Sequence, residues 1–211
     1  MRNSRVLLSL ASGCIGLWCS GCSLEQPYPA KDSFVLRGGD IGRAPVTLNE
    51  TVQVQPVRIA PPYDGRSLVY RTGDVSFTRD YYNVFIAPPD ELATAELIRL
   101  LSESGLFARV SSVASGGNSD VILECMVTDL YADERDPKNP AAICRAKFRR
   151  LSNAPGNTLL IDSGAMEATV PVASNTGEGI ATALGKAFGT TVKKFVDAAA
   201  KPSDKVGANP E

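Results

Sequence analysis

The stretch that decides the fold reads Pro61-Pro62-Tyr63-Asp64-Gly65-Arg66-Ser67-Leu68-Val69-Tyr70-Arg71 at its centre. Before it, apolar residues alternate over 51–59, and after it an aromatic-rich run covers 81–86; both patterns predict strands. The Pro-Pro-Tyr-Asp-Gly sequence predicts a tight corner, because proline presets φ and Asp-Gly permits a positive φ. The stretch therefore predicts one supersecondary unit of strands joined by a corner.

A helix is predicted directly after these strands, ending at Ser104. Pro88 and Pro89 suit its first turn, where the missing N–H is not needed. Apolar residues then follow with helical spacing, and Gly105 is the residue type that commonly ends a helix in the left-handed conformation. A second amphipathic pattern predicts a helix over 176–199.

The whole pattern predicts an α+β fold. We expect a two-layer sandwich in which two amphipathic helices lie on one face of a mostly antiparallel sheet of about five strands. Hydrophobic content of 44% and charge of 21% are ordinary for a folded domain. One domain is expected over 33–200, preceded by a Pro-containing tether over 22–32 and followed by a disordered tail over 201–211.

Charge and histidine content exclude several classes of function. A net charge of -1 provides no basic surface for nucleic acid. The chain has no histidine, so His-based triads and His metal ligands are absent from it. No phosphate-binding Gly-rich loop is present, and the acidic turn around Asp133 lacks the pattern of a calcium loop. We expect neither a metal nor a cofactor beyond a covalent lipid.

Residues 1–21 are interpreted as a lipoprotein signal peptide. Arg2 and Arg5 precede an apolar run over 6–18, which is too short to span a bilayer, since a spanning helix needs about 20 residues. Small residues over 20–21 then precede Cys22, as in the lipobox of bacterial lipoproteins, whose cysteine thiol is acylated and becomes the mature N-terminus. The sequence therefore predicts a lipid anchor on Cys22, and an ordinary secretory signal or a buried apolar helix is the alternative.

Two other cysteines compete for this role. Cys14 would leave only a short apolar run, and Cys19 follows the bulky Trp18. Cys22 is therefore preferred, although Cys19 stands where a lipobox usually has leucine. One acyl chain binds a membrane marginally and a second makes attachment stable, so a triacylated Cys22 predicts permanent attachment. Ser23, in place of Asp, favours export to the outer membrane.

Two further cysteines, Cys125 and Cys144, lie on predicted strands joined by one hairpin. Outside the cytosol they could form a disulfide. Two separately buried free thiols are the alternative, because cysteine also packs as a small apolar residue. The absence of Cys-x-x-Cys spacing argues against zinc or redox chemistry.

The central stretch, the aromatic strand that ends in Ala87-Pro88-Pro89, and the helix that closes with Ser104-Gly105-Leu106-Phe107 follow each other in the order of a known family. The sequence resembles the ABC-type transport auxiliary lipoproteins, which include the paraquat-inducible C lipoproteins. The similarity spans about Phe34 to Phe195, and the Tyr-x-Gly-x-x-Leu-Val-Tyr-Arg part is its most specific portion. Phe85 stands where the family often has tryptophan.

The resemblance implies a lipid-anchored, periplasm-facing protein of the outer membrane that is no enzyme. It would be the docking piece of a transport system built on a mammalian-cell-entry (MCE) domain protein, and it leaves a homo-oligomer open. Tyrosine and arginine are common interface anchors. The candidate partner-binding residues are Pro61, Pro62, Tyr63, Arg66, Tyr70, Arg71, Tyr82 and Phe85.

Three other functions are weighed against docking. A periplasmic lipid-binding carrier would need an apolar pocket between the helices and the sheet. A structural lipoprotein of envelope assembly would need only the anchor and the fold. A periplasmic hydrolase would need a nucleophile with a base other than histidine, and neither Ser-x-x-Lys nor Gly-x-Ser-x-Gly occurs in the sequence.

Overall fold

The computed structural model describes residues 30–154 and 160–201. The predicted signal peptide, Cys22, most of the tether and the tail beyond residue 201 lie outside these residues. The described strands are β1 (Asp32–Phe34), β2 (Leu48–Val54), β3 (Arg58–Ile59), β4 (Ser67–Arg71), β5 (Phe77–Phe85), β6 (Phe107–Ser112), β7 (Val121–Asp133), β8 (Ala141–Ser152) and β9 (Leu160–Pro171). The helices are α1 (Pro89–Ser104) and α2 (Gly177–Ala199), with 3-10 turns η1 (Pro61–Tyr63) and η2 (Val113–Ser115).

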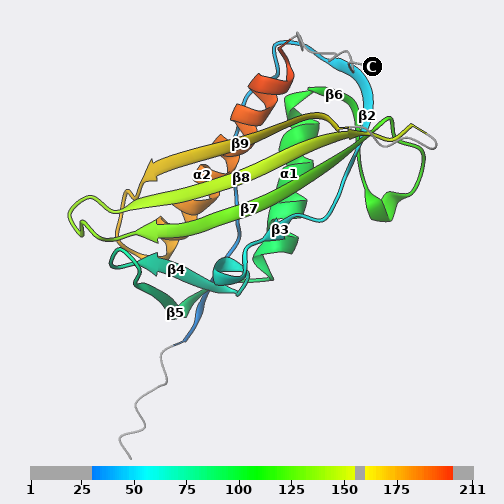
Figure 1. The fold of residues 1–211 in the computed structure, drawn as a ribbon. Helices are drawn as coiled ribbons and strands as arrows, with labels where there is room; N and C mark the ends of the chain where they lie inside the picture. The colour runs from blue at the N-terminus through cyan, green and yellow to red at the C-terminus, as the bar shows by residue number, and fades with distance from the viewer. Residues whose placement is uncertain (1–29, 155–159, 202–211) are drawn as a thin grey trace, which may run out of the picture. The chain divides into compact units, whose positions relative to one another are not determined.

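The sheet differs from the prediction. The nine strands of the described residues form one mixed sheet (Figure 1), so the expectation of about five mostly antiparallel strands is wrong. The order along the main path is β1-β5-β4-β7-β2-β6, with β3 and β8 also on β7 and β9 on β8. Only β4–β5, β7–β8 and β8–β9 are antiparallel; the other described pairs are parallel.

Strand β7 explains how so many strands join one sheet. Its 13 residues pair with β8 along one edge and in turn with β2, β3 and β4 along the other. The broken strand expected over 51–59 is thus two strands that both pair with β7. Parallel partners require a crossover, usually a helix, and α1 lies in the connection that leads from β2 to its parallel partner β6.

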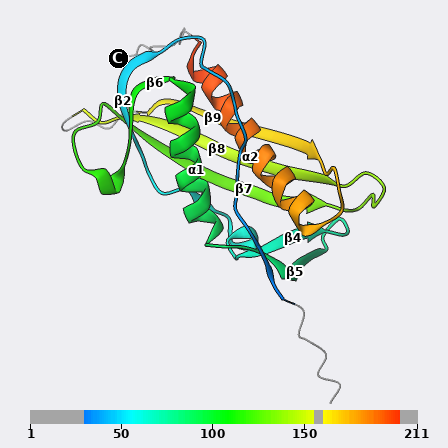
Figure 2. The ribbon, with the colours of Figure 1, turned by 180° about the vertical axis from the view of Figure 1, so that it is seen from behind.

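Both helices cover the same face of the sheet (Figure 2). Helix α2 packs on β8 and β9, whereas α1 packs on β6 and on α2. Phe148 of β8 stacks on Phe195 of α2 with ring centroids 4.7 Å apart, and both rings are buried. Each fully buried side chain of this size contributes about 1.5–3 kcal/mol relative to exposure. The core therefore lies between the two helices and the three long strands.

Helix α1 has the ends that its sequence predicted. Pro89 lies in its first turn beside Asp90 and Glu91, whose negative charges suit the helix N-terminus. Gly105 ends it in the left-handed conformation with φ of 67°. The prediction of this helix is confirmed.

The segment between β1 and β2 crosses α2 with its backbone against the helix. A Cβ atom on Gly185 would lie 2.2 Å from the Arg37 carbonyl oxygen, and one on Gly189 would lie 2.1 Å from that of Gly38. Only glycine permits so close an approach. The Gly38 amide also donates to the buried carboxylate of Glu96 on α1, so this segment ties the two helices together.

The predicted disulfide is not formed, because Cys125 and Cys144 are free, buried thiols. Cys125 lies opposite Phe148, four residues from Cys144 along β8. Four residues of a strand span about 13 Å, whereas a disulfide requires Cα atoms within about 7 Å. Direct pairing would have needed a two-residue turn, but the connection between β7 and β8 spans residues 134–140.

Candidate docking site

Two exposed tyrosines, Tyr81 and Tyr82, lie on an irregularity of β5. Ser67 and Val69 are two residues apart in β4. Their partners in β5, Val84 and Arg79, are five residues apart. Strand β5 therefore carries three extra residues at this point, which is a large bulge. Bulges re-aim side chains and are common next to functional sites.

Asp80 holds this bulge in place. Its carboxylate accepts hydrogen bonds from the Tyr82 amide at 2.8 Å, the Asn83 amide at 3.0 Å, the Asn83 side chain at 2.8 Å and the Tyr70 hydroxyl at 2.7 Å. Burial alone would raise the pKa of Asp80, but the hydrogen bonds from Asn83 and Tyr70 outweigh it, so the pKa lies below its ordinary value. Burial and the bond to Asp80 raise the pKa of Tyr70. The carboxylate is thus charged and fully engaged at neutral pH.

The rings above this clamp remain accessible. Tyr81 is 61% exposed and Tyr82 45%, and the two rings meet edge to face at 5.1 Å. The Lys31 ammonium lies 4.0 Å from the centroid of the Tyr81 ring, a favourable cation–π distance. Lys31, Tyr81 and Tyr82 are called the tyrosine patch below, and the patch lies where the described chain begins.

A second aromatic surface lies where η1 meets the sheet. Tyr63 stacks on Tyr131 of β7 at 5.8 Å, and Phe77 of β5 meets both rings edge to face at 6.2 and 5.4 Å. Tyr63 and Tyr131 are buried, but Phe77 is 44% exposed. The Arg71 guanidinium lies 5.9 Å from the Phe77 centroid. These four residues are called the aromatic corner below.

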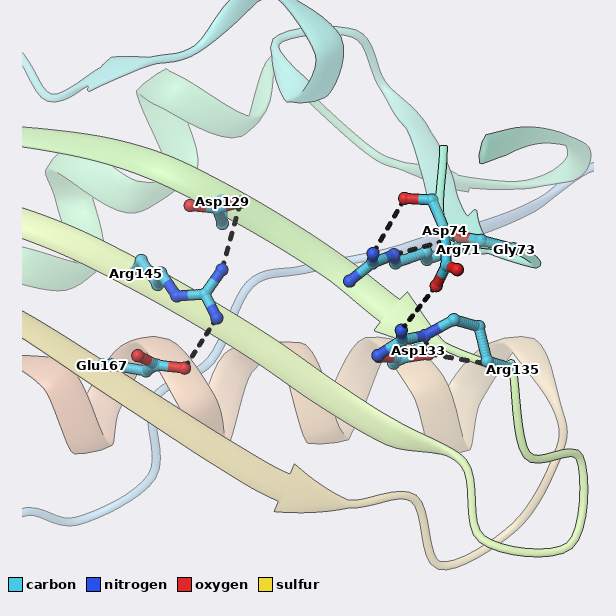
Figure 3. A network of polar contacts seen from close by, with 8 residues as sticks. All are labelled: Arg71, Gly73, Asp74, Asp129, Asp133, Arg135, Arg145 and Glu167. Carbon is cyan, nitrogen blue, oxygen red and sulfur yellow. Dashed lines mark hydrogen bonds and ion pairs between the residues drawn. The ribbon is translucent and has the colours of Figure 1, made fainter. Parts of the chain in front are cut away.

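Ion pairs cover the sheet face beside the aromatic corner, turned away from the helices (Figure 3). Arg145 of β8 lies 3.5 Å from Asp129 of β7 and 2.8 Å from Glu167 of β9. Its charge and hydrogen bond hold the pKa of Glu167 below its ordinary value. These charges are neutralised across the strands, and exposed pairs of this kind contribute little to stability.

Arg71 is held at the edge of the same face (Figure 3). It donates to the carbonyl oxygens of Gly73 at 3.1 Å and Asp74 at 2.8 Å. The Asp74 carboxylate also pairs with Arg135 at 3.1 Å, and Arg135 pairs with Asp133 at 2.8 Å. The turn between β4 and β5 is thereby tied to the end of β7, which fixes the guanidinium beside Phe77.

The structure divides the predicted partner-binding residues into three groups. Tyr63 and Phe85 are 8% and 2% exposed and pack in the core. Arg66 and Tyr70 act locally, with Arg66 donating to the Phe85 carbonyl oxygen at 2.7 Å and Tyr70 bonded to Asp80. Pro61, Pro62 and Tyr82 are exposed, as is the rest of Arg66, and Arg71 is half-buried.

Sequence reasoning did not single out Phe77, Tyr131, Asp80 or Lys31. Phe77 and Tyr131 meet only through the parallel pairing of β4 with β7, which no local pattern shows. The role of Asp80 had a local signal, since aspartate often accepts a hydrogen bond from the amide two residues later, here that of Tyr82.

A cavity of about 460 Å³ lies between the segment after β1 and the outer side of α2. Its lining includes Phe34 and Val35 on one side and Ala181 and Thr182 on the other, with Arg37 and Lys186 also present. The volume falls in the range of small-molecule sites. No helix within residues 30–154 and 160–201 is long and apolar enough to cross a membrane.

The described residues thus form a mixed sheet with both helices on one face and expose aromatic rings at two places. The chain belongs to the family of ABC-type transport auxiliary lipoprotein components, which matches residues 36–195. The resemblance stated from the sequence is therefore confirmed. Membership of this family makes the chain a transport-associated lipoprotein with a membrane-anchored location in the cell envelope.

Solved structures share the fold at low sequence identity. Protein XCC0632 from Xanthomonas campestris, of the DUF330 family, has a TM-score of 0.65 at 17% identity, covering 80% of this chain and 92% of that one. A second, uncharacterized protein has a TM-score of 0.61 at 15% identity, with 79% and 97% covered. At these identities the likeness concerns the fold alone. No curated protein matches the chain in sequence.

Proposed function

We propose that this protein is the docking lipoprotein of an MCE-type ABC transport system that moves phospholipid or another hydrophobic substrate. The lipid on Cys22 anchors it in the outer membrane, and the domain faces the periplasm. The family match over residues 36–195 is the observation that carries this proposal. In this function the domain binds an MCE-domain protein and catalyses no reaction.

The aromatic corner supports the docking role. Aromatic side chains and arginine are enriched at the centres of protein interfaces, and here Phe77 and Arg71 lie together beside the exposed Pro61 and Pro62. Phe77 rests on two buried tyrosine rings, so little side-chain freedom is lost on binding. A partner that covers Phe77 gains apolar contact with a surface that is already ordered.

The thiols support a non-catalytic role. Reactive cysteines are accessible and have a lowered pKa. Burial raises the pKa of Cys144 to about 12 and also raises that of Cys125. Both side chains therefore stay protonated and shielded in the core at neutral pH.

The substitution Phe77→Asp tests the docking surface. It places a charge at the centre of the proposed contact, so we expect the tagged, lipidated full-length variant to recover at least about tenfold less MCE-domain protein from detergent-solubilised envelopes. Val113→Asp is the matched control, because Val113 is 47% exposed and lies after β6, at the other end of the strand order. Equal recovery by both variants would count against the aromatic corner as the docking surface.

A lipid carrier is the second candidate, and the cavity beside α2 is the observation that favours it. Phe34, Val35 and Ala181 provide apolar lining, and Arg37 and Lys186 provide positive charge for an anionic headgroup. Lipid extraction of the purified protein with mass spectrometry separates the two functions. Stoichiometric phospholipid beyond the anchor supports the carrier, and its absence supports docking.

A further inference from the structure

We propose that the tyrosine patch rests on the bilayer to which the protein is anchored, with the rings of Tyr81 and Tyr82 in the headgroup region. This inference deepens the proposed function and rests on the anchor at Cys22. It assigns Tyr82 to lipid and leaves the aromatic corner to the protein partner. The β1–β5 edge of the sheet would then face the membrane.

The length of the tether carries the first step. Eight residues, 23–30, separate Cys22 from Lys31. A fully extended chain spans at most about 3.3–3.6 Å per residue, so Lys31 stays within about 30 Å of the anchored cysteine. The Lys31 ammonium lies 4.0 Å from the Tyr81 ring centroid. The two tyrosines are therefore within reach of the bilayer surface.

The chemistry of the patch carries the second step. Tyrosine has an apolar ring and a polar tip and is enriched at membrane–water interfaces. A lysine beside the rings favours lipid phosphate groups. Asp80, the carboxylate of the bulge itself, is held by four hydrogen bonds, so its charge is engaged within the domain, whereas Asp32 of β1, which pairs with Asn83, is exposed.

The bulge carries the third step. By contrast, Tyr131 in the regular strand β7 stacks on Tyr63 of η1 and is buried. The extra residues of β5 instead keep Tyr81 and Tyr82 61% and 45% exposed. The rings are held outward before any contact forms, which reduces the entropic cost of binding a surface.

Tryptophan fluorescence tests the proposal. The single tryptophan of the sequence, Trp18, lies in the predicted signal peptide, so Tyr82→Trp gives the mature protein one tryptophan, which can be excited selectively. The lipidated protein is reconstituted into vesicles of phosphatidylethanolamine and phosphatidylglycerol, with or without acyl chains brominated near the headgroup. Val113→Trp is the matched control, because it follows β6 at the opposite edge of the strand order.

We expect bromination to reduce the emission of Tyr82→Trp by at least about twofold and to leave Val113→Trp unchanged, because only an interfacial ring reaches the brominated region. Circular dichroism confirms that both variants fold. If both variants float with the vesicles and Tyr82→Trp is unquenched, the inference is overturned and the proposed anchor stands. If Tyr82→Trp is shielded only after an MCE-domain protein is added, the patch binds protein instead. A mature protein that does not float overturns the anchor and the inference together.

Discussion

At the scale of single residues, two buried or half-buried carboxylates organise the surfaces described above. Asp80 fixes the bulge that carries Tyr81 and Tyr82, and Glu96 fixes the segment that follows β1. Each carboxylate accepts hydrogen bonds from backbone amides outside the helices: Asp80 from Tyr82 and Asn83, and Glu96 from Gly38. Removing the carboxylate leaves a donor unpaired, and each unpaired buried donor lowers the free energy of unfolding by about 1–3 kcal/mol.

The first prediction concerns Asp80. In Asp80→Ala, two backbone amides, one side-chain amide and the Tyr70 hydroxyl lose their acceptor, so the free energy of unfolding should fall by about 1–3 kcal/mol in urea titrations. Asp64→Ala is the control, because Asp64 is exposed and makes no side-chain hydrogen bond among the described residues. It should change the free energy of unfolding by less than about 0.5 kcal/mol. Equal effects of the two substitutions would refute the clamp.

The second prediction concerns pH. Burial alone would raise the pKa of Glu96, but hydrogen bonds from Arg99 and the Gly38 amide lower it below its ordinary value of 4.5. A lowered folded-state pKa stabilises the protein above the ordinary value, and the stabilisation is lost as the pH falls through the folded-state value. Glu96→Gln should therefore destabilise the protein at pH 7 by about 1–3 kcal/mol, and the difference should shrink as the pH falls below the ordinary value of 4.5.

Urea unfolding of wild type and Glu96→Gln at a series of pH values checks the direction of this pH dependence. Glutamine keeps the shape of the side chain but cannot balance the charge of Arg99, which lies 2.6 Å from the carboxylate. A gap between wild type and Glu96→Gln that stays constant from pH 7 to pH 3 would show that the ionised carboxylate is not what stabilises this site.

At the scale of elements, the local sequence pattern predicted the helices better than it predicted the sheet. The limits of α1 follow from Pro89 and Gly105, whose effects are local. The side chain of Thr176 caps α2 by accepting from the Gly179 amide at 3.1 Å, a role typical of threonine, so the helix begins one residue later than predicted. Helix ends depend on neighbours in sequence, so the residues themselves predict them.

Strand pairing depends on residues far apart in sequence, and here prediction failed. The alternation over 51–59 indicated strand but could not show that β2 and β3 both pair in parallel with β7. The disulfide prediction failed for the same reason, because the register of β7 on β8 decides how far Cys125 lies from Cys144. The candidate docking site was predicted only in part, since its rings come together through these same pairings.

The third prediction concerns the glycine face of α2. Gly→Ala inside a helix ordinarily stabilises by about 0.5–1 kcal/mol. At Gly189 the new methyl would meet the Gly38 carbonyl oxygen at 2.1 Å, so Gly189→Ala should instead destabilise by about 1–3 kcal/mol. Gly65→Ala is the control, because its methyl would meet nothing within 4 Å. A stabilised Gly189→Ala variant in thermal unfolding would contradict the close packing of residues 37–38 on the helix.

At the scale of the whole molecule, different parts of the surface of the described residues differ in character. The helices and the segment after β1 bury one face of the sheet, and cross-strand ion pairs such as Arg145 with Glu167 cover the other. Two places interrupt this pattern with exposed aromatic rings. We assign the aromatic corner to the protein partner and the tyrosine patch to the membrane, so one domain would link a transport assembly to a bilayer.

The most direct measurement is site-specific photo-crosslinking in living cells. A photoreactive phenylalanine analogue replaces Phe77 in the full-length protein, and mass spectrometry identifies the attached protein. We expect an MCE-domain protein at position 77 and none at position 113, where Val113 is similarly exposed. Capture of only unrelated envelope proteins at position 77, or of the same proteins at both positions, would contradict the docking function.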